Sequence, residues 1–254
     1  MRRLIALLLS PLAAFSFAIG AQAQDYEREQ RWADETMQTL VVGDALKIAQ
    51  KNGHQFLALY TQATNPRGAV VIAHGRGWSP DYDLYGALRT RIADAGYSTL
   101  SIQMPVLPST SKLGDYIDLF PDADERIGLA VAWLRAKGYQ RIAIVSHSLG
   151  ATMANHYLIR TPDKAIGAWV FISIINGLED MFRVKIPVLD VFGAQDWDIT
   201  RVGADERREQ IRRIPGSQQV VIADAQHFFE GKQDELTQVI VTFLDRALAT
   251  GAKK

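Results

Sequence analysis

Four short, predominantly apolar runs constrain the fold of this chain more than any other feature. They lie at residues 69–73, 142–145, 169–175 and 188–192. Runs without the alternation of a half-buried strand are typical of strands buried on both faces of a parallel sheet. Parallel neighbours need crossover connections, usually helices, so the runs predict a sheet covered by helices on both faces.

The segments between these runs carry helical patterns, as the crossovers require. One repeats apolar residues at intervals of four and ends at a glycine: Leu84, Leu88, Ile92 and Gly96. A second begins at Pro121, where Asp122 and Glu125 have the spacing of a capping box. It continues as one apolar face that stops at a glycine: Ile127, Ala130, Val131, Leu134 and Gly138. An amphipathic helix is expected at residues 236–248.

Residues 43–49 and 54–61 have strand character, and Asn52-Gly53 between them is a strong hairpin signal. Further strands are expected at residues 97–104 and 220–223. The pattern predicts an α/β protein, a three-layer α/β/α sandwich whose mostly parallel sheet carries an antiparallel N-terminal hairpin. Because no repeat or flexible linker interrupts it, we expect one domain over residues 24–254.

The first 23 residues have the layout of a secretory signal peptide. Two arginines precede the mostly apolar residues 4–19, and Ala21-Gln22-Ala23 is a small-x-small cleavage signal. An uncleaved membrane anchor is the alternative, but the apolar run is short for a full span and contains Ser10 and Pro11. We therefore expect cleavage after Ala23, no stable membrane span afterwards, and an exported protein that is periplasmic or secreted.

Composition excludes several classes of protein. The chain of 254 residues has no cysteine, which removes disulfides, thiolate metal sites and a cysteine nucleophile, and suits an oxidising compartment. Lys and Arg number 28, as do Asp and Glu, so loss of Arg2 and Arg3 would leave 26 basic residues against 28 acidic ones. No net basic charge indicates a nucleic-acid partner. Arginines cluster at residues 207–213, but acidic residues alternate with them, which favours a solvated helix face.

A serine in the middle of the chain has the setting of a nucleophile. Residues 146–150, Ser-His-Ser-Leu-Gly, connect the apolar run at 142–145 to a helix-compatible segment at 151–158. A strand that passes through a tight turn of small residues into a helix is the local pattern of a nucleophile elbow. The pattern predicts Ser148 as the nucleophile, which requires a general base and a third group that orients the base.

Five histidines could supply that base: His54, His74, His147, His156 and His227. His227 lies in a loop directly after a strand. It is also the only histidine that follows both Ser148 and a suitable acid in the chain. We therefore predict that His227 is the base.

The acid is expected in the loop after the apolar run at 188–192. Asp196 lies there, which gives the chain order Ser148, Asp196, His227, with all three at the carboxyl ends of strands. Asp198, two residues further on, is the main alternative. Asp190 lies within the strand and is expected to be structural. Asp224 precedes His227 by too few residues to orient its ring.

Backbone amides would bind the negative charge that develops on the substrate oxygen. Leu149, next after the nucleophile, supplies one amide. The turn of His74, Gly75, Arg76 and Gly77 directly follows the run at 69–73 and would supply the second from Arg76. Its two glycines allow a close backbone approach. This chemistry needs neither a metal nor a cofactor, and none is expected.

Four elements, in this order and spacing, resemble the α/β-hydrolase superfamily over nearly the whole mature chain: residues 71–75, 146–150 and 192–196, and His227. Other stretches resemble an exported bacterial branch of it: residues 96–101, Pro105 and residues 186–191. The resemblance implies Ser148 as nucleophile, Asp196 as acid and His227 as base, and it implies oxyanion amides from Leu149 and Arg76.

The superfamily pattern Gly-x-Ser-x-Gly is altered here, because Ser146 stands in place of the first glycine. Serine is small enough for the close packing at that position. Family cap domains usually follow the strand that corresponds to residues 169–175, and residues 176–185 leave no room for one. The extended loop at 106–120 would supply a pocket wall or lid from three residues: Tyr116, Leu119 and Phe120.

A serine nucleophile indicates cleavage of an ester, thioester or amide through an acyl-enzyme. We expect a carboxylesterase or thioesterase with an open cleft, whose substrate is a small-molecule or polymer-borne acyl ester. Two alternatives remain: a serine peptidase or amidase, and a non-catalytic, envelope-associated binding protein of the same fold.

Overall fold

The computed structural model describes residues 24–175 and 177–249, which form an eight-stranded sheet in the order β1-β2-β4-β3-β5-β6-β7-β8. The strands are β1 Asp44–Ala49, β2 Gln55–Thr61, β3 Gly68–Ala73, β4 Tyr97–Ile102, β5 Ile142–His147, β6 Ile166–Ile172, β7 Val188–Gly193 and β8 Gln218–Ile222. Neighbours from β4 to β8 pair in parallel, whereas β1 with β2 and β2 with β4 pair antiparallel. The predicted sheet and its N-terminal hairpin are confirmed.

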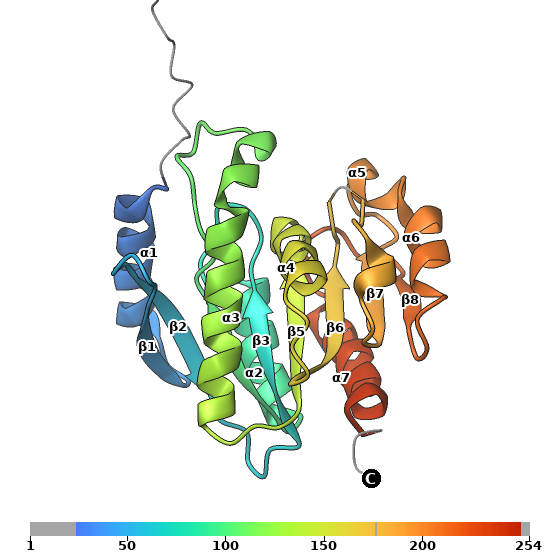
Figure 1. Cartoon of the computed structure of the whole chain (residues 1–254), viewed down its shortest axis with the longest axis horizontal. Helices are drawn as coiled ribbons and strands as arrows, with labels where there is room; N and C mark the ends of the chain where they lie inside the picture. Colours follow the sequence, from blue (N-terminus) through green and yellow to red (C-terminus); the bar gives the residue numbers. More distant parts are fainter. Residues whose placement is uncertain (1–23, 176, 250–254) are drawn as a thin grey trace, which may run out of the picture.

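Helices cover both faces of the sheet, as Figure 1 shows. They are α1 Tyr26–Thr39, α2 Leu84–Asp94, α3 Phe120–Ala136, α4 Leu149–Arg160, α5 Asp198–Arg201, α6 Ala204–Ile211 and α7 Gln233–Ala249, with the 3₁₀ helices η1 Leu113–Leu119 and η2 Met181–Arg183. α3 packs beside α4 on one face, and α2 packs beside α7 on the other. The three-layer α/β/α sandwich is therefore confirmed.

Alternate residues of the central strands enter two separate cores. In β5, Ile144 packs with the α3 and α4 side chains, whereas Val145 packs with those of α2 and α7. Val71 and Val70 divide in the same way in β3. Successive residues of a strand point to opposite faces, and here both faces are covered by helices. Neighbouring positions therefore both have to be apolar, which gives nearly continuous apolar runs in the sequence.

Most expected elements lie where the sequence places them. β1 and β2 pair from Asp44 with Tyr60 to Ala49 with Gln55, and Gly53 in their turn has φ 86°. β6 begins and ends earlier than expected, and it ends before Ser173, whose φ of 48° departs from strand geometry.

The expected capping box at the start of α3 is wrong. α3 continues directly from η1, and its N-cap residue makes no side-chain cap. Glu125 instead accepts a hydrogen bond from the backbone N–H of Lys51 at 2.7 Å. Gln50 Nε2 donates to Asp122 Oδ1 at 3.5 Å and to Glu125 Oε2 at 3.3 Å. The two carboxylates therefore attach the hairpin turn to α3 rather than end the helix.

The expectation of a solvated face at residues 207–213 holds for Arg208 and Arg212 but is wrong for Arg207. Arg207 is buried, and its Nε donates to Asp190 Oδ2 at 2.9 Å. Asp190 thus has the structural role expected of it. A charge pattern along one helix does not show that a partner lies on a neighbouring strand.

α1 is an element that the apolar pattern of the sequence does not predict. Its main apolar contact is Ala33, which packs on Leu57 and Leu59 of β2. An ion pair anchors it further, because the buried carboxylate of Glu29 accepts hydrogen bonds from Arg126 Nη1 and Nη2 of α3 at 3.0 and 3.1 Å.

Parallel strands bring their carboxyl ends to one edge of the sheet, and the loops that follow β3, β5, β7 and β8 meet there. The predicted signal peptide, residues 1–23, lies outside the described residues. In the part of the chain that the structure describes, no helix has the length and apolar character needed to cross a bilayer.

Candidate active site

Ser148 lies on a tight turn between β5 and α4, in the position predicted for it. Its backbone has φ 54° and ψ −125°, a conformation that costs a non-glycine residue energy and is held by its surroundings. The Ser148 N–H donates to the Ile172 carbonyl of β6 at 2.9 Å. Its side chain makes no helix cap, so the hydroxyl is free to turn toward the cleft.

Two glycines allow the close packing around this turn. A Cβ at Gly150 would lie 2.2 Å from the carbonyl oxygen of His74, a distance that no side chain tolerates. A Cβ at Gly75 would lie 3.0 Å from Ser148 Cβ. The turn after β3 and the elbow after β5 are therefore in direct backbone contact.

Ser146, which replaces the first glycine of the family pattern, has a specific partner. Its Oγ accepts a hydrogen bond from the buried indole Nε1 of Trp169 at 2.9 Å and donates to the Val170 carbonyl at 3.2 Å. The hydroxyl thus satisfies an indole N–H that would otherwise be buried alone.

The structure brings Ser148, His227 and Asp196 together. His227 Nε2 lies 3.1 Å from Ser148 Oγ, and His227 Nδ1 lies 2.7 Å from Asp196 Oδ1. All three side chains are buried, with His227 only 2% exposed. These are the contacts that a nucleophile, its base and the orienting acid require.

Hydrogen bonds hold Asp196 in its ionised form. Burial alone would raise the pKa of Asp196, but bonds from His227, from the Ser173 hydroxyl and from the Trp197 N–H outweigh it, and the net pKa is lowered. The rival Asp198 is exposed and pairs with Arg201. Asp196 is therefore the carboxylate in contact with the histidine.

The indole of Trp197 lies flat against the imidazole of His227. The ring centroids are 3.6 Å apart and the planes differ by 8°. The sequence analysis did not single out Trp197, although its place directly after Asp196 was a signal that could have suggested contact with the histidine.

The turn of residues 74–77 lies against Ser148, and its buried histidine fixes its shape. His74 Nδ1–H donates to the Gly75 carbonyl at 2.8 Å, and His74 Nε2 accepts from the Met104 N–H at 2.9 Å. Burial lowers the pKa of His74 to about 4, so the ring is neutral at pH 7. Within the described residues, the amides of Arg76 and Leu149 donate no hydrogen bond to the protein.

A hydrogen-bonded chain links this turn to the loop that contains His227. The Gly75 N–H donates to Tyr85 Oη at 2.9 Å, the Tyr85 O–H donates to His147 Nδ1 at 2.8 Å, and His147 Nε2–H donates to the His227 carbonyl at 3.0 Å. The carbonyl can only accept, which assigns the proton to Nε2. Burial, together with the nearby His227, lowers the pKa of His147 to about 3.

A cleft of about 500 Å³ opens above Ser148. Aromatic side chains form much of its wall: Trp78, Tyr116, Trp197 and Phe228. Of the three residues expected to form a pocket wall or lid, Tyr116 lines the cleft. Leu119 and Phe120 are instead buried in the core with α3 and α4.

Two arginines also line this cleft, Arg76 from the turn of residues 74–77 and Arg28 from α1. Sequence reasoning did not include Arg28, because it did not predict α1. The available signal was the start of the helix, where Asp25 caps the Arg28 N–H at 2.9 Å and acidic residues occupy the first turn.

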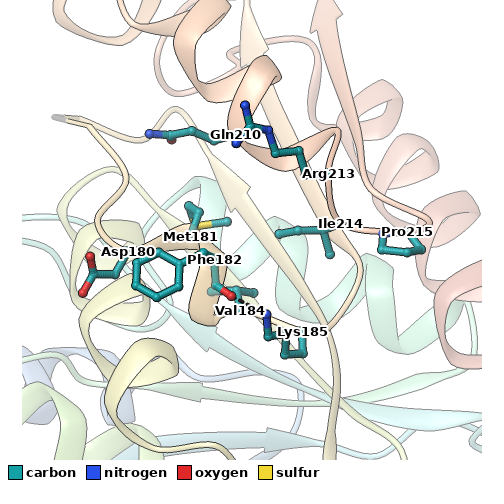
Figure 2. Close-up of a pocket in the computed structure, with 9 residues that line it drawn as sticks. All are labelled: Asp180, Met181, Phe182, Val184, Lys185, Gln210, Arg213, Ile214 and Pro215. Atoms are coloured by element: carbon teal, nitrogen blue, oxygen red, sulfur yellow. Dashed lines mark hydrogen bonds between the residues drawn. The ribbon is translucent and has the colours of Figure 1, made fainter.

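A second cavity, of about 560 Å³, lies between η2 and the end of α6 (Figure 2). It shares no lining residue with the cleft above Ser148. Phe182, Lys185 and Arg213 line it, and its lining contains no nucleophile paired with a base. The chemistry that the sequence predicts therefore belongs to the cleft above Ser148.

Comparison with known proteins places this geometry in context. A family model described as a protein of unknown function (DUF3530) matches residues 3–115. No curated protein matches the chain.

Solved structures match far more of it. Est1E from Butyrivibrio proteoclasticus aligns with a TM-score of 0.65 at 17% identity, covering 82% of this chain and 100% of its own. The esterase Pf2001 from Pyrococcus furiosus gives 0.64 at 17% identity, over 81% of this chain and 93% of its own. XC6422 from Xanthomonas campestris, a serine hydrolase described as having no lid, aligns with a TM-score of 0.61 at 16% identity. The alignment covers 82% of this chain and 95% of XC6422.

These alignments cover about four-fifths of this chain, and at such low identity they concern the fold. The sheet order, the parallel pairing and the N-terminal hairpin agree with them. The chain is therefore a protein of the α/β-hydrolase fold.

Proposed function

We propose that this protein is a serine hydrolase that cleaves esters through an acyl-enzyme on Ser148. One observation carries the proposal: Ser148, on a strained elbow, is hydrogen-bonded to His227, which is hydrogen-bonded to Asp196. A buried hydroxyl, imidazole and carboxylate in this order can activate a serine for attack.

The first half-reaction forms the acyl-enzyme. His227 Nε2 takes the hydroxyl proton as Ser148 Oγ attacks the ester carbonyl, and the ionised Asp196 stabilises the imidazolium. The carbonyl oxygen becomes negative between the free amides of Leu149 and Arg76, where each such donor is typically worth about 3 kcal/mol. His227 then protonates the leaving alcohol.

The second half-reaction releases the acid. Water enters the cleft, loses a proton to His227 and attacks the acyl carbon, and the same two amides hold the oxyanion. Ser148 leaves with its proton restored, and the free carboxylic acid departs.

The shape of the cleft favours a short acyl ester or an acyl group on a polymer. The cleft is open, and between β6 and β7 the described chain has only loops and the short helix η2. Hydrolysis of 4-nitrophenyl esters of increasing acyl length tests this, and we expect a maximum at short chains. A maximum at long chains would contradict it.

The location that we propose is outside the cytoplasm. It rests on the charged start, apolar run and Ala-x-Ala site of residues 1–23. Expression of the full chain should yield an exported protein that begins at Gln24 by mass spectrometry. Recovery of the intact N-terminus in a membrane fraction would instead indicate an uncleaved anchor.

The test of the catalytic assignment is labelling with a fluorophosphonate, which reacts with activated serines. The wild type should be labelled and Ser148→Ala should not. Ser109→Ala is the matched control, because Ser109 lines the same cleft without a histidine partner, and it should keep its labelling. A folded wild type that resists labelling would favour a binding protein, and faster turnover of amides than of matched esters would favour a peptidase.

A further inference from the structure

The cleft above Ser148 has an unusual charge. Arg28 and Arg76 line it, and no carboxylate, lysine or other charged side chain does so in the described part of the chain. The substrate therefore meets two guanidinium groups next to the reacting serine. Since this inference concerns the substrate, it rests on the proposed function.

Neither arginine is neutralised by the protein. Most of the arginines in residues 24–175 and 177–249 pair with a carboxylate, as Arg126 does with Glu29 and Arg207 with Asp190. Within the same residues, Arg28 and Arg76 form no ion pair. Two charges left unpaired beside a cleft are free to bind a ligand anion.

Both guanidinium groups are held in place by backbone carbonyls. Arg28 Nη1 donates to the Leu107 carbonyl at 2.7 Å, and its guanidinium carbon lies 4.4 Å from the ring centroid of Trp32. Arg76 Nη2 donates to the Ser111 carbonyl at 3.1 Å. A guanidinium has five N–H donors, so each group keeps several that no acceptor among the described residues uses. Such fixed, charged donors match the oxygens of a carboxylate or phosphate.

The position of Arg28 relates this charge to the reaction. Its Nη2 lies 3.7 Å from the point that a Cβ on Gly77 would occupy. Arg28 is therefore adjacent to the turn of residues 74–77, which contains the proposed oxyanion donor Arg76. Arg76 belongs to that turn, and its side chain lines the cleft while donating to the Ser111 carbonyl. An anion bound here would share the cleft with Ser148.

We propose that the cleft selects esters that carry a second, anionic group, a carboxylate or a phosphate, which Arg28 and Arg76 bind. Aromatic walls would hold the carbon skeleton between that anion and the ester. The two arginines are specificity residues, because they contact the part of the substrate that does not react.

The experiment compares charged esters with neutral partners of the same shape. Mono-4-nitrophenyl adipate against methyl 4-nitrophenyl adipate places the anion on the acyl side. 4-Acetoxybenzoate against its methyl ester places it on the alcohol side. We expect at least one charged ester to have a kcat/KM about tenfold higher than its neutral partner, and added salt should reduce this advantage.

Three variants assign the effect. Arg28→Gln and Arg76→Gln should each reduce the preference about tenfold, mainly through the KM of the charged ester. The readout is the ratio of kcat/KM between the charged and the neutral ester, because a general loss of activity lowers both alike. Arg76→Gln keeps the backbone amide. Arg213→Gln is the matched control, an exposed arginine in the other cavity, and it should change nothing.

The outcomes separate the two proposals. If the wild type hydrolyses neutral esters as fast as charged ones, the anion site is wrong and the serine hydrolase stands. If it hydrolyses neither, the proposed function fails. Calorimetric binding of adipate to Ser148→Ala then gives a readout without turnover: binding that Arg28→Gln abolishes supports the anion site, and no binding overturns it.

Discussion

At the scale of single residues, the site depends on polar groups whose partners lie on other strands. Ser146 shows this well. In the sequence, Ser146 replaces the first glycine of the motif. In the fold, its hydroxyl accepts a hydrogen bond from the indole of Trp169. The altered position is therefore matched by a bulky neighbour that uses the added oxygen.

Ser146→Ala should lower the free energy of unfolding by about 1–3 kcal/mol, because the Trp169 indole N–H would be buried without an acceptor. Urea unfolding followed by circular dichroism measures this. The double variant Ser146→Ala with Trp169→Phe should lose less than the sum of the two single variants, because it removes donor and acceptor together. Strict additivity would show that the hydrogen bond does not contribute.

At the scale of elements, α1 connects the start of the described chain to the cleft. Glu29 binds the fully buried Arg126 of α3 through both of its carboxylate oxygens, and Arg126 Nη1 also donates to the Gln103 carbonyl at 3.0 Å. Gln103 Nε2 in turn lies 2.9 Å from His74 Nε2 in the turn of residues 74–77. The ion pair therefore orients both Arg28 and the turn.

Glu29→Gln should lower the free energy of unfolding by about 3 kcal/mol, because it leaves the Arg126 charge buried without its counterion. Urea unfolding again measures the change. Glu27→Gln is the matched control, since Glu27 lies exposed on the same helix, and it should shift stability by less than about 0.5 kcal/mol. Equal effects of the two substitutions would mean that the buried ion pair does not hold α1.

At the scale of the whole molecule, two buried neutral histidines make stability depend on pH. The pKa is lowered to about 4 in His74 and to about 3 in His147, mainly by burial, against about 6.5 in an unfolded chain. Below pH 6.5 the unfolded chain therefore binds protons that the folded chain does not, and the free energy of unfolding falls as the pH falls.

Between pH 7 and pH 5 we expect a loss of about 2 kcal/mol for each of these histidines. Urea unfolding at pH 7, 6 and 5 checks it. His147→Gln should be less stable at pH 7, since the Tyr85 chain is disturbed, but should lose less stability on going to pH 5. The same pH dependence in both proteins would contradict the assignment of His147 as a buried neutral group.

Local sequence was sufficient for most of the fold. Strand burial, helix faces and the hairpin turn are recorded in nearby residues, so the α/β/α sandwich follows from apolar periodicity. The charged helix α1 was not predicted from the sequence, because its stability comes from one ion pair with a distant helix rather than from an apolar stripe. The capping box failed because helix α3 continues an earlier turn.

The sequence by itself determined the succession of the eight strands along the chain, most of the helices between them, and the positions of Ser148, Asp196 and His227 after strands. Only the tertiary structure decided the contacts between distant residues: Trp197 flat on His227, Ser146 under Trp169, and Arg28 facing the cleft from α1. The physical reason is that backbone and burial preferences act over a few residues. A hydrogen bond or charge contact between segments far apart exists only once packing has fixed both.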